Sequence, residues 1–148
     1  MSDFPSAVLF ACNMNSIRSP MAEGLLKFLH GDRIFIDSVG VRPGEVNGFS
    51  VAVMDEIGID ISRHNAKSFD DLKDSYFDLV IPLSPEAQHK AMEMTRVMAC
   101  EVDFWNTFDP SLIESEDREI LLDAYRKVRD QLMERIKDRF PLVRISDT

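Results

Sequence analysis

Hydrophobic residues in this chain form short apolar runs that alternate with longer segments of helical periodicity. The run at residues 7–11 is short and uninterrupted, which is typical of a strand buried on both faces. Between the runs, apolar residues recur every three or four positions, as they do on the buried face of a helix. The pattern predicts strands at residues 7–11, 34–38, 77–81 and 97–104, and helices at residues 20–30, 47–57, 85–94 and 115–140.

Strands that alternate with helices indicate a parallel sheet, because each helix returns the chain to the end of the sheet where the next strand begins. We therefore expect an α/β fold, a three-layer sandwich around a central four-stranded parallel sheet. The length of 148 residues fits one domain, residues 1–148, with a single substantial core. The helical stripes expected in that core comprise Met21, Leu25, Phe28 and Leu29 in the first helix and Ile120, Ala124, Val128, Leu132 and Ile136 in the last.

The segment between the first strand and the first helix carries the candidate chemistry. Cys12 follows the strand, and Ser19 and Pro20 are typical of the N-cap and the first position of a helix. A strand, a short loop and a helix N-terminus together bind anions, because backbone N–H groups and the helix dipole converge there. The same field favours a thiolate, and the guanidinium of Arg18 matches two oxygens of a phosphate. The pattern predicts a cysteine nucleophile in an oxyanion pocket, with the Ser19 hydroxyl donating to its sulfur.

The alternative interpretation of this segment is a buried cysteine at a strand end beside a solvated arginine. The helix start directly after Arg18 favours the pocket over that alternative. Ligands of parallel α/β folds bind at the carboxyl ends of the strands, which is where Cys12 is expected to lie.

At these residues the chain resembles the low-molecular-weight protein tyrosine phosphatases and the related thioredoxin-coupled arsenate reductases. The loop of that family runs Cys-x-Gly-Asn-x-Cys-Arg-Ser and is usually followed by Pro-Met-Ala-Glu. The matching residues here are Cys12, Asn15, Arg18, Ser19, Pro20, Met21, Ala22 and Glu23. Two residues depart from the pattern, Met14 in place of Gly and Ile17 in place of the second Cys. Glycine in such a loop often serves a conformation that a side chain disfavours, so Met14 bears on the shape of the pocket.

The resemblance implies a phosphatase that hydrolyses phosphate monoesters, protein phosphotyrosine or another aryl phosphate, through a phosphocysteine intermediate. It implies catalytic roles for Cys12, Arg18 and Asp109, the last as a general acid in an Asp-Pro pair. On spacing alone, that pair indicates a turn. The phosphate-binding residues that the resemblance implies are Asn13, Met14, Asn15, Ser16, Ile17, Arg18 and Ser19.

The resemblance also implies two supporting residues. Ser38 and His64 match positions whose hydrogen bonds brace the loop asparagine, here Asn15. Without the resemblance, His64 is interpreted as a surface histidine.

Two other functions remain open on the same scaffold. Arsenate has the shape and charge of phosphate, and Trp105 and residues 125–130 are similar to the reductase branch. The reductases carry relay cysteines after the third strand, where this chain has Ser84, and Cys100 comes only at the fourth strand. A module that binds phosphate or a phosphoprotein with little turnover is the other alternative, which Met14 and Ser84 favour.

The residues after the Asp-Pro pair bear on the substrate. Family members that prefer phosphotyrosine usually carry aromatic residues there, whereas Ser111 and Leu112 follow in this chain. A phosphorylated protein or a small phosphate ester is therefore the expected substrate class.

Charge and cysteine content limit the binding partners and the cellular compartment that we expect. The formal net charge of −9 argues against nucleic acids and acidic membranes as partners. The sequence shows no signal peptide and no apolar run long enough to span a bilayer. Two cysteines form no disulfide framework, so we expect the reduced cytoplasm. The expected chemistry needs no metal or other cofactor, and no pattern in the sequence indicates an oligomeric state.

Overall fold

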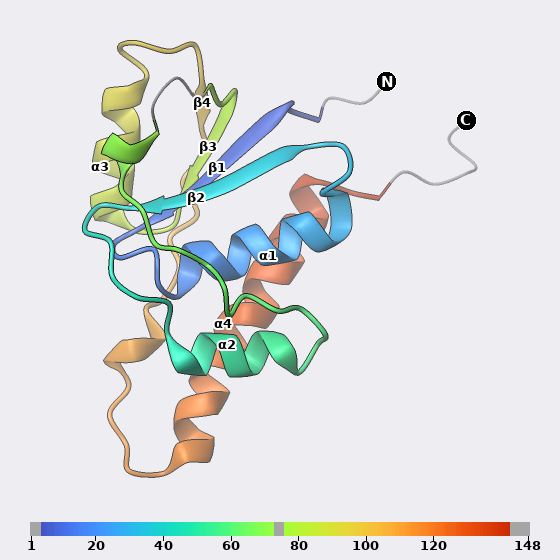
Figure 1. Ribbon diagram of the computed structural model, residues 1–148, viewed down its shortest axis with the longest axis vertical. Coiled ribbons are helices and arrows are strands. Elements are labelled where there is room, and N and C mark those ends of the chain that lie inside the picture. The colour runs from blue at the N-terminus through green and yellow to red at the C-terminus, as the bar shows by residue number, and fades with distance from the viewer. Residues whose placement is uncertain (1–3, 73–75, 143–148) are drawn as a thin grey trace.

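The computed structural model describes residues 4–72 and 76–142, and its strands and helices alternate along the chain (Figure 1). In chain order the elements are β1 (Ala7–Cys12), α1 (Arg18–His30), β2 (Phe35–Gly40), α2 (Gly48–Asp55), the 3₁₀ turn η1 (Phe69–Asp71), β3 (Leu79–Pro82), α3 (Pro85–Met94), β4 (Glu101–Val102), the 3₁₀ turn η2 (Pro110–Leu112) and α4 (Arg118–Arg139). The predicted order of strands and helices is confirmed.

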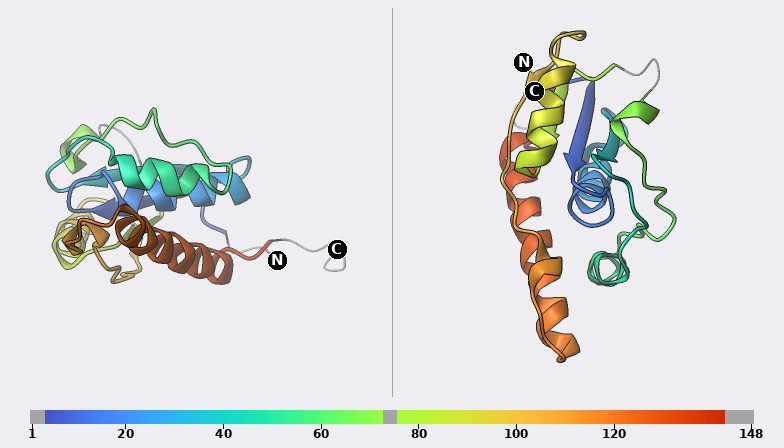
Figure 2. Two further views of the ribbon diagram at one scale, coloured as in Figure 1. Left: turned by 90° about the horizontal axis from the view of Figure 1, so that it is seen from below. Right: turned by 90° about the vertical axis from the view of Figure 1, so that its left-hand side faces the viewer.

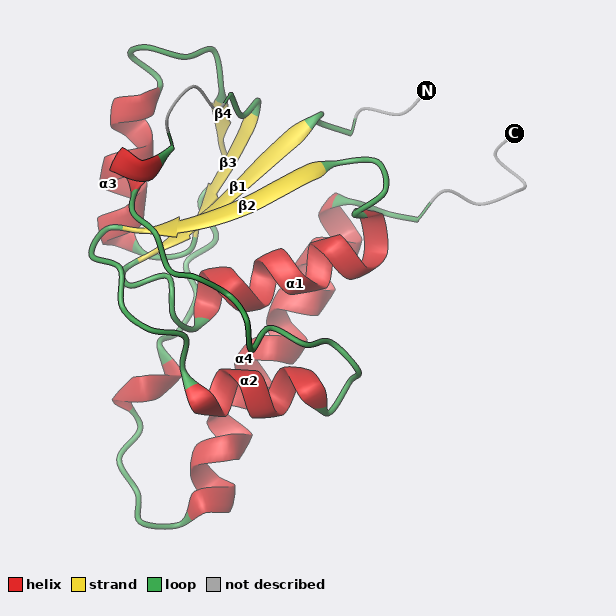
Figure 3. Cartoon of the chain, viewed as in Figure 1, coloured by secondary structure: helices red, strands yellow, loops and turns green. Residues whose placement is uncertain are grey.

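The strands form one parallel sheet in the order β2-β1-β3-β4 (Figure 3). Strand β1 therefore lies inside the sheet, where Ala11 pairs with Val39 of β2 and with Pro82 of β3. Since all strands run the same way, their carboxyl ends share one edge of the sheet. The prediction of an α/β fold with a central four-stranded parallel sheet is confirmed.

Strand β1 is buried on both faces, and its alternate residues enter two cores. Val8, Phe10 and Cys12 belong to the core that α1, α2 and α4 share with the sheet, whereas Leu9 and Ala11 belong to the core under α3. In Figure 1, α3 accordingly lies on the other side of the strands from α1 and α4, and Figure 2 shows the layers from two further directions. The uninterrupted apolar run arises because a central parallel strand has no solvent face.

Several expectations about the helices are wrong in detail. Helix α1 begins at Arg18 with Ile17 as its N-cap, so Ser19 is not the cap and Pro20 is the third helical residue rather than the first. Phe28 is 64% exposed and Ile120 is 52% exposed, and neither these nor the half-buried Ala124 belong to the core. In α4 the core-facing positions of the first turns are Leu122 and Tyr125, because its stripe winds around the helix rather than following one row of residues.

Strand β4 is much shorter than the predicted strand at residues 97–104. Val97 is exposed and lies in a turn that continues α3, where its N–H donates to the carbonyl of Met94. Beyond the two strand residues, however, backbone bonds to β3 continue, from Asp103 N to Val80 O and from Trp105 N to Pro82 O. This extension carries the chain to the carboxyl end of the sheet.

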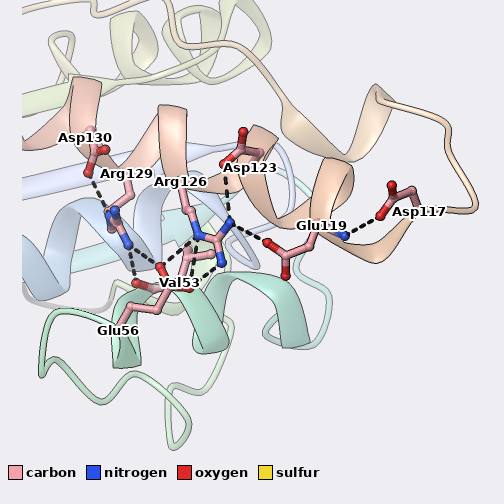
Figure 4. Close-up of polar contacts among 8 residues, drawn as sticks. All are labelled: Val53, Glu56, Asp117, Glu119, Asp123, Arg126, Arg129 and Asp130. Atoms are coloured by element: carbon pink, nitrogen blue, oxygen red, sulfur yellow. Dashed lines mark hydrogen bonds and ion pairs between the residues drawn. The ribbon is translucent and has the colours of Figure 1, made fainter.

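Helix α2 is held against α4 by a cluster of ion pairs around Glu56 (Figure 4). Arg126 and Arg129 both donate to the Glu56 carboxylate, and Arg129 also donates to the carbonyl of Val53.

In the part of the chain that the structure covers, no helix is long and apolar enough to cross a membrane.

Candidate active site

Residues 12–18, called here loop 12–18, lie at the carboxyl edge of the sheet, between the end of β1 and the start of α1. Residues 105–113, called loop 105–113, reach the same edge from β4. The structure thus brings Arg18 and Asp109 together and places Cys12 on the same edge of the sheet, although ninety-odd residues separate Asp109 from the other two.

The carbonyl groups of loop 12–18 are held by one neighbouring segment, the residues that follow β2. Val41 N donates to Cys12 O at 3.0 Å and Arg42 N to Asn13 O at 2.7 Å. Gly44 N donates to Met14 O at 2.8 Å, and Asn47 N donates to Ser16 O at 2.9 Å. In a trans peptide the N–H points opposite to the carbonyl of the same unit. The amide groups of residues 13, 14, 15 and 17 therefore point away from that segment.

Helix α1 adds further N–H groups to the loop. Its N-cap, Ile17, makes no side-chain cap hydrogen bond, so the amides of the first turn are not capped from within the helix. Pro20 lies in that first turn, where its missing N–H costs nothing. The uncapped helix start and the turned amides are the kind of arrangement that binds anions in proteins.

The amide side chain of Asn15 braces the loop from behind and is fully buried. Its Oδ1 accepts from Lys67 N at 3.0 Å and from His64 Nε2 at 2.9 Å. Its Nδ2 donates to Ser19 Oγ at 2.8 Å and to Ser38 Oγ at 2.9 Å. Because a backbone N–H can only donate, Lys67 fixes which end of the amide faces it, and His64 must carry its proton on Nε2.

This network ends at the candidate nucleophile. Ser19 Oγ lies 2.9 Å from Cys12 Sγ, and it accepts from Asn15. The Ser19 hydroxyl has one hydrogen, for which the sulfur at 2.9 Å is a nearer acceptor than Val39 O at 3.4 Å. Donated to the sulfur, that hydrogen stabilises a thiolate. The sequence expectation that Ser19 faces the sulfur agrees with this distance, while its expected capping role is replaced by this contact.

Glu23 is the buried charge behind the brace. Its Oε1 accepts from Ser38 Oγ, and it lies 3.7 Å from His64 Nδ1. Burial lowers the pKa of His64, and the Glu23 carboxylate opposes that shift. Lys27, one turn further along α1, pairs with the other oxygen of Glu23.

Arg18 joins the two loops. Its NH1 donates to Thr107 O at 2.9 Å, and its NH2 lies 3.8 Å from Asp109 Oδ2. The other oxygen of Asp109 accepts from Ser111 N at 3.0 Å and from Ser111 Oγ at 2.7 Å. This arrangement fixes the carboxyl and leaves Oδ2 facing the guanidinium.

Tyr125 of α4 is buried near Asp109. Burial raises the pKa of the Tyr125 hydroxyl, and the Asp109 carboxylate acts in the same direction. The Tyr125 ring packs on Phe49 at 5.3 Å between centroids, which holds α2 against α4.

Met14 does not occupy the strained position of loop 12–18. The residue with a left-handed backbone is Asn15, at φ 54°, a conformation that asparagine tolerates better than most side chains. Met14 instead lies over Gly44, where a Cβ would come within 2.7 Å of its Cε. The loop keeps its shape with a side chain at position 14 because the neighbouring segment is small there.

Sequence reasoning missed several contributors. Glu23 was matched without a role, although its spacing of four from Ser19 places both on one face of α1. Gly40 ends β2 directly under the loop, where a Cβ would lie 2.6 Å from Asn15 N. Thr107 contributes a backbone carbonyl, for which a sequence carries no signal.

Comparison with known proteins agrees with this geometry. A family model described as low molecular weight phosphotyrosine protein phosphatase matches residues 7–141. The chain is 31% identical over 137 residues to a glutaredoxin arsenate reductase of Synechocystis sp., covering 88% of this chain and 93% of that protein. It is 35% identical over 130 residues to an arsenate reductase of Halalkalibacterium halodurans, covering 88% of this chain and 91% of that protein.

A solved structure gives the same fold. The low molecular weight protein tyrosine phosphatase from T. tengcongensis superposes with a TM-score of 0.72 at 29% identity, covering 90% of this chain and 96% of that one. The scaffold is therefore shared by proteins named phosphatases and by proteins named arsenate reductases.

Proposed function

The chain belongs to the low molecular weight phosphotyrosine protein phosphatase family, and from this premise we propose that it hydrolyses phosphate monoesters. One observation carries the proposal: Arg18, at the end of the loop that begins with Cys12, has its guanidinium 3.8 Å from Asp109 Oδ2. A nucleophile, an oxyanion site and an acid on one edge of a sheet are the parts that ester hydrolysis needs.

In the proposed reaction, Cys12 Sγ attacks phosphorus in line with the leaving oxygen. The amides of loop 12–18 and the guanidinium of Arg18 bind the three equatorial oxygens. The phosphorus–oxygen bond breaks with its electron pair on the leaving group, which takes a proton from Asp109. Asp109 then takes a proton from the water that attacks the phosphocysteine, and the thiolate leaves with the support of the Ser19 hydroxyl.

The substrate in this proposal is a phosphorylated protein or a small aryl phosphate ester. Phe108, 52% exposed, adjoins Asp109 and places an aromatic ring before the Asp-Pro pair rather than after it. All charge stabilisation comes from amides and Arg18, so the proposed steps call for no metal. A reducing compartment such as the cytoplasm keeps Cys12 in the thiol form that the reaction requires.

The second candidate function is arsenate reduction, which the names of the two curated relatives favour. Reduction leaves an oxidised sulfur that a second thiol must resolve. Cys100 is the other cysteine of the sequence and lies directly before β4, at the amino edge of the sheet, opposite the edge of Cys12. Burial raises the pKa of the Cys100 thiol, which makes it a poor nucleophile at neutral pH. Reduction by this chain therefore requires an external thiol, such as glutathione with glutaredoxin.

One experiment separates these functions. We expect hydrolysis of a small aryl phosphate by the wild type, full activity in Cys100→Ser and none in Cys12→Ser. Arsenate is offered in parallel with thioredoxin and with glutathione plus glutaredoxin. Arsenate turnover without ester hydrolysis would replace the proposal by the second candidate. Phosphate binding with neither turnover would leave a binding module.

A further inference from the structure

Loop 12–18 has two flanks, and they are held by different means. On the flank of β2, backbone N–H groups hold the loop carbonyls, among them Asn13 O, which accepts from Arg42 N at 2.7 Å. On the flank of β3, the backbone ladder stops at the bond from Leu83 N to Ala11 O, 2.7 Å long. Any support beyond that bond must come from side chains.

The next pair in the same register supplies that support. Strands β1 and β3 pair Phe10 with Ile81 and Ala11 with Pro82, so Asn13 falls opposite Ser84 two positions further on. Ser84 Oγ lies 2.6 Å from Asn13 Oδ1 and donates to it. A side-chain bond thus takes the place of the missing ladder bond.

Ser84 is itself fixed. It is the N-cap of α3, and its Oγ accepts from Ala87 N at 3.1 Å. The residue is 2% exposed, so its hydroxyl is shielded from bulk water. A hydroxyl has one hydrogen, and with the acceptor role taken up by the cap, that hydrogen goes to Asn13.

We propose that Ser84 is a positioning residue for the oxyanion site, since its hydroxyl holds Asn13 in the register of β3 and so fixes the first peptide units of the loop. The proposal rests on the proposed function only in treating loop 12–18 as an oxyanion site. Asn13 is then held on one side by a backbone bond that any sequence can make and on the other by a bond that needs this pair of side chains.

The test measures binding of inorganic phosphate without turnover. The readout is the phosphate concentration that halves the rate of Cys12 alkylation by iodoacetate, followed by mass spectrometry of the Cys12 peptide. The variants are Asn13→Ala, Ser84→Ala, the double variant and Ser84→Thr. Glu86→Gln is the matched control, because it breaks the exposed ion pair of Arg42 with α3 and leaves the Ser84 bond intact.

We expect Asn13→Ala and Ser84→Ala each to raise the half-protecting concentration about three- to tenfold, the worth of one buried hydrogen bond. The half-protecting concentration of the double variant should not exceed that of the more affected single variant, because both changes remove the same bond. Ser84→Thr keeps a hydroxyl and should stay within about twofold of the wild type, as should Glu86→Gln.

Melting temperatures separate positioning from capping. Ser84→Ala also loses the cap of α3 and should melt about 2–4 °C lower, whereas Asn13→Ala keeps that cap. If Ser84→Ala does not fold, Asn13→Ala alone decides. The proposal is overturned if the half-protecting phosphate concentration of Asn13→Ala equals that of the wild type. It is also overturned if the fold-changes of the two single variants multiply in the double variant. Failure of ester hydrolysis leaves this readout intact, so the two proposals fail separately.

Discussion

Loop 12–18 and loop 105–113 meet at Arg18, but their hydrogen bonds come from different distances along the chain. In loop 12–18, partners of Asn15 come from Ser38, His64 and Lys67, and the brace is buried. In loop 105–113, the hydrogen bonds to the Asp109 carboxylate come from Ser111, two residues on, and Leu112 next to Ser111 is 68% exposed. Loop 12–18 is therefore held by hydrogen bonds from segments far away in the sequence. Among the residues that the structure describes, loop 105–113 has such bonds only at its start, and the residues around Asp109 are held by their sequence neighbours.

The difference matches what each loop does in the proposed reaction. An oxyanion site gains most when its donors are already in place, because no reorganisation is then needed as charge develops. A residue that first gives a proton and then takes one must serve two different oxygens, so local hydrogen bonds that leave one carboxyl oxygen open suit it better. The comparison predicts that changes in loop 12–18 affect binding and every substrate, whereas changes at Asp109 affect substrates unequally.

The largest effect is expected at Cys12. Cys12→Ser removes the nucleophile and should lower kcat for a small aryl phosphate by at least about 10³-fold. The amides and Arg18 stay in place, so binding of inorganic phosphate, measured by equilibrium dialysis, should persist. Residual turnover above about 1% would show that Cys12 is not the nucleophile.

A smaller and selective effect is expected at Asp109. Asp109→Ala should slow esters with poor leaving groups by about 10²–10⁴-fold and esters with good leaving groups much less, since only the poor ones need a proton. The measurement is kcat for a series of aryl phosphates of graded leaving-group acidity.

Asp117→Ala is the control for that series. Asp117 accepts from Glu119 N at the start of α4 much as Asp109 accepts from Ser111 N, so it tests loss of a helix cap without loss of the acid. It should leave the whole series unchanged. Equal losses across the series in Asp109→Ala would make Asp109 structural only.

The same contrast between local and long-range contacts explains what the sequence predicts. The buried strand β1, the loop with Cys12 and Arg18, and the helix after it are one continuous stretch whose periodicity and motif are local properties. Their types and order were therefore predicted, as was the parallel sheet that follows from alternation. The ends of the elements were predicted less well. Ser19, for example, does not cap α1, because its hydroxyl contacts Cys12 and Asn15 instead.

The rest of the site depends on contacts between distant segments. The carbonyl of Thr107 and the small size of Gly40 matter only because of what the fold brings against them. Phe28 has the spacing of a core residue, yet within residues 4–72 and 76–142 its side of α1 is left exposed. Such facts are properties of packing, which periodicity within one helix does not contain.

A third prediction weakens the brace of loop 12–18. Asn15→Gly keeps a residue that accepts a positive φ but loses the four hydrogen bonds of the amide. We expect a loss of about 2–4 kcal/mol in the free energy of unfolding, as for a buried network left unsatisfied. Asn15→Ala should be about 1 kcal/mol worse, because it adds left-handed strain. Urea unfolding measures both, and equal stability of Asn15→Gly and the wild type would contradict the brace.

The smallest effect is expected away from both loops, at the ion pairs that hold α2 on α4. Hydrogen bonds from Arg126, with help from Arg129, lower the pKa of Glu56 from 4.5 to about 2. A lowered pKa in the folded state means that the carboxylate stabilises the fold fully above pH 4.5 and loses that contribution as the pH falls toward 2. Glu56→Gln should therefore cost about 1 kcal/mol or less at pH 7, since the side chain is partly exposed.

The difference between Glu56→Gln and the wild type in urea unfolding should shrink steadily between pH 4.5 and pH 2. Glu119→Gln is the matched control, because Glu119 contacts the same Arg126 but is 73% exposed, and it should change stability less at every pH. Neither variant touches loop 12–18 or loop 105–113, so hydrolysis at pH 7 should stay unchanged in both. A difference that is constant from pH 7 to pH 2 would contradict the lowered pKa of Glu56. A loss of activity in Glu56→Gln would mean that the α2–α4 contact acts on the candidate site, so that its geometry depends on more than loop 12–18 and loop 105–113.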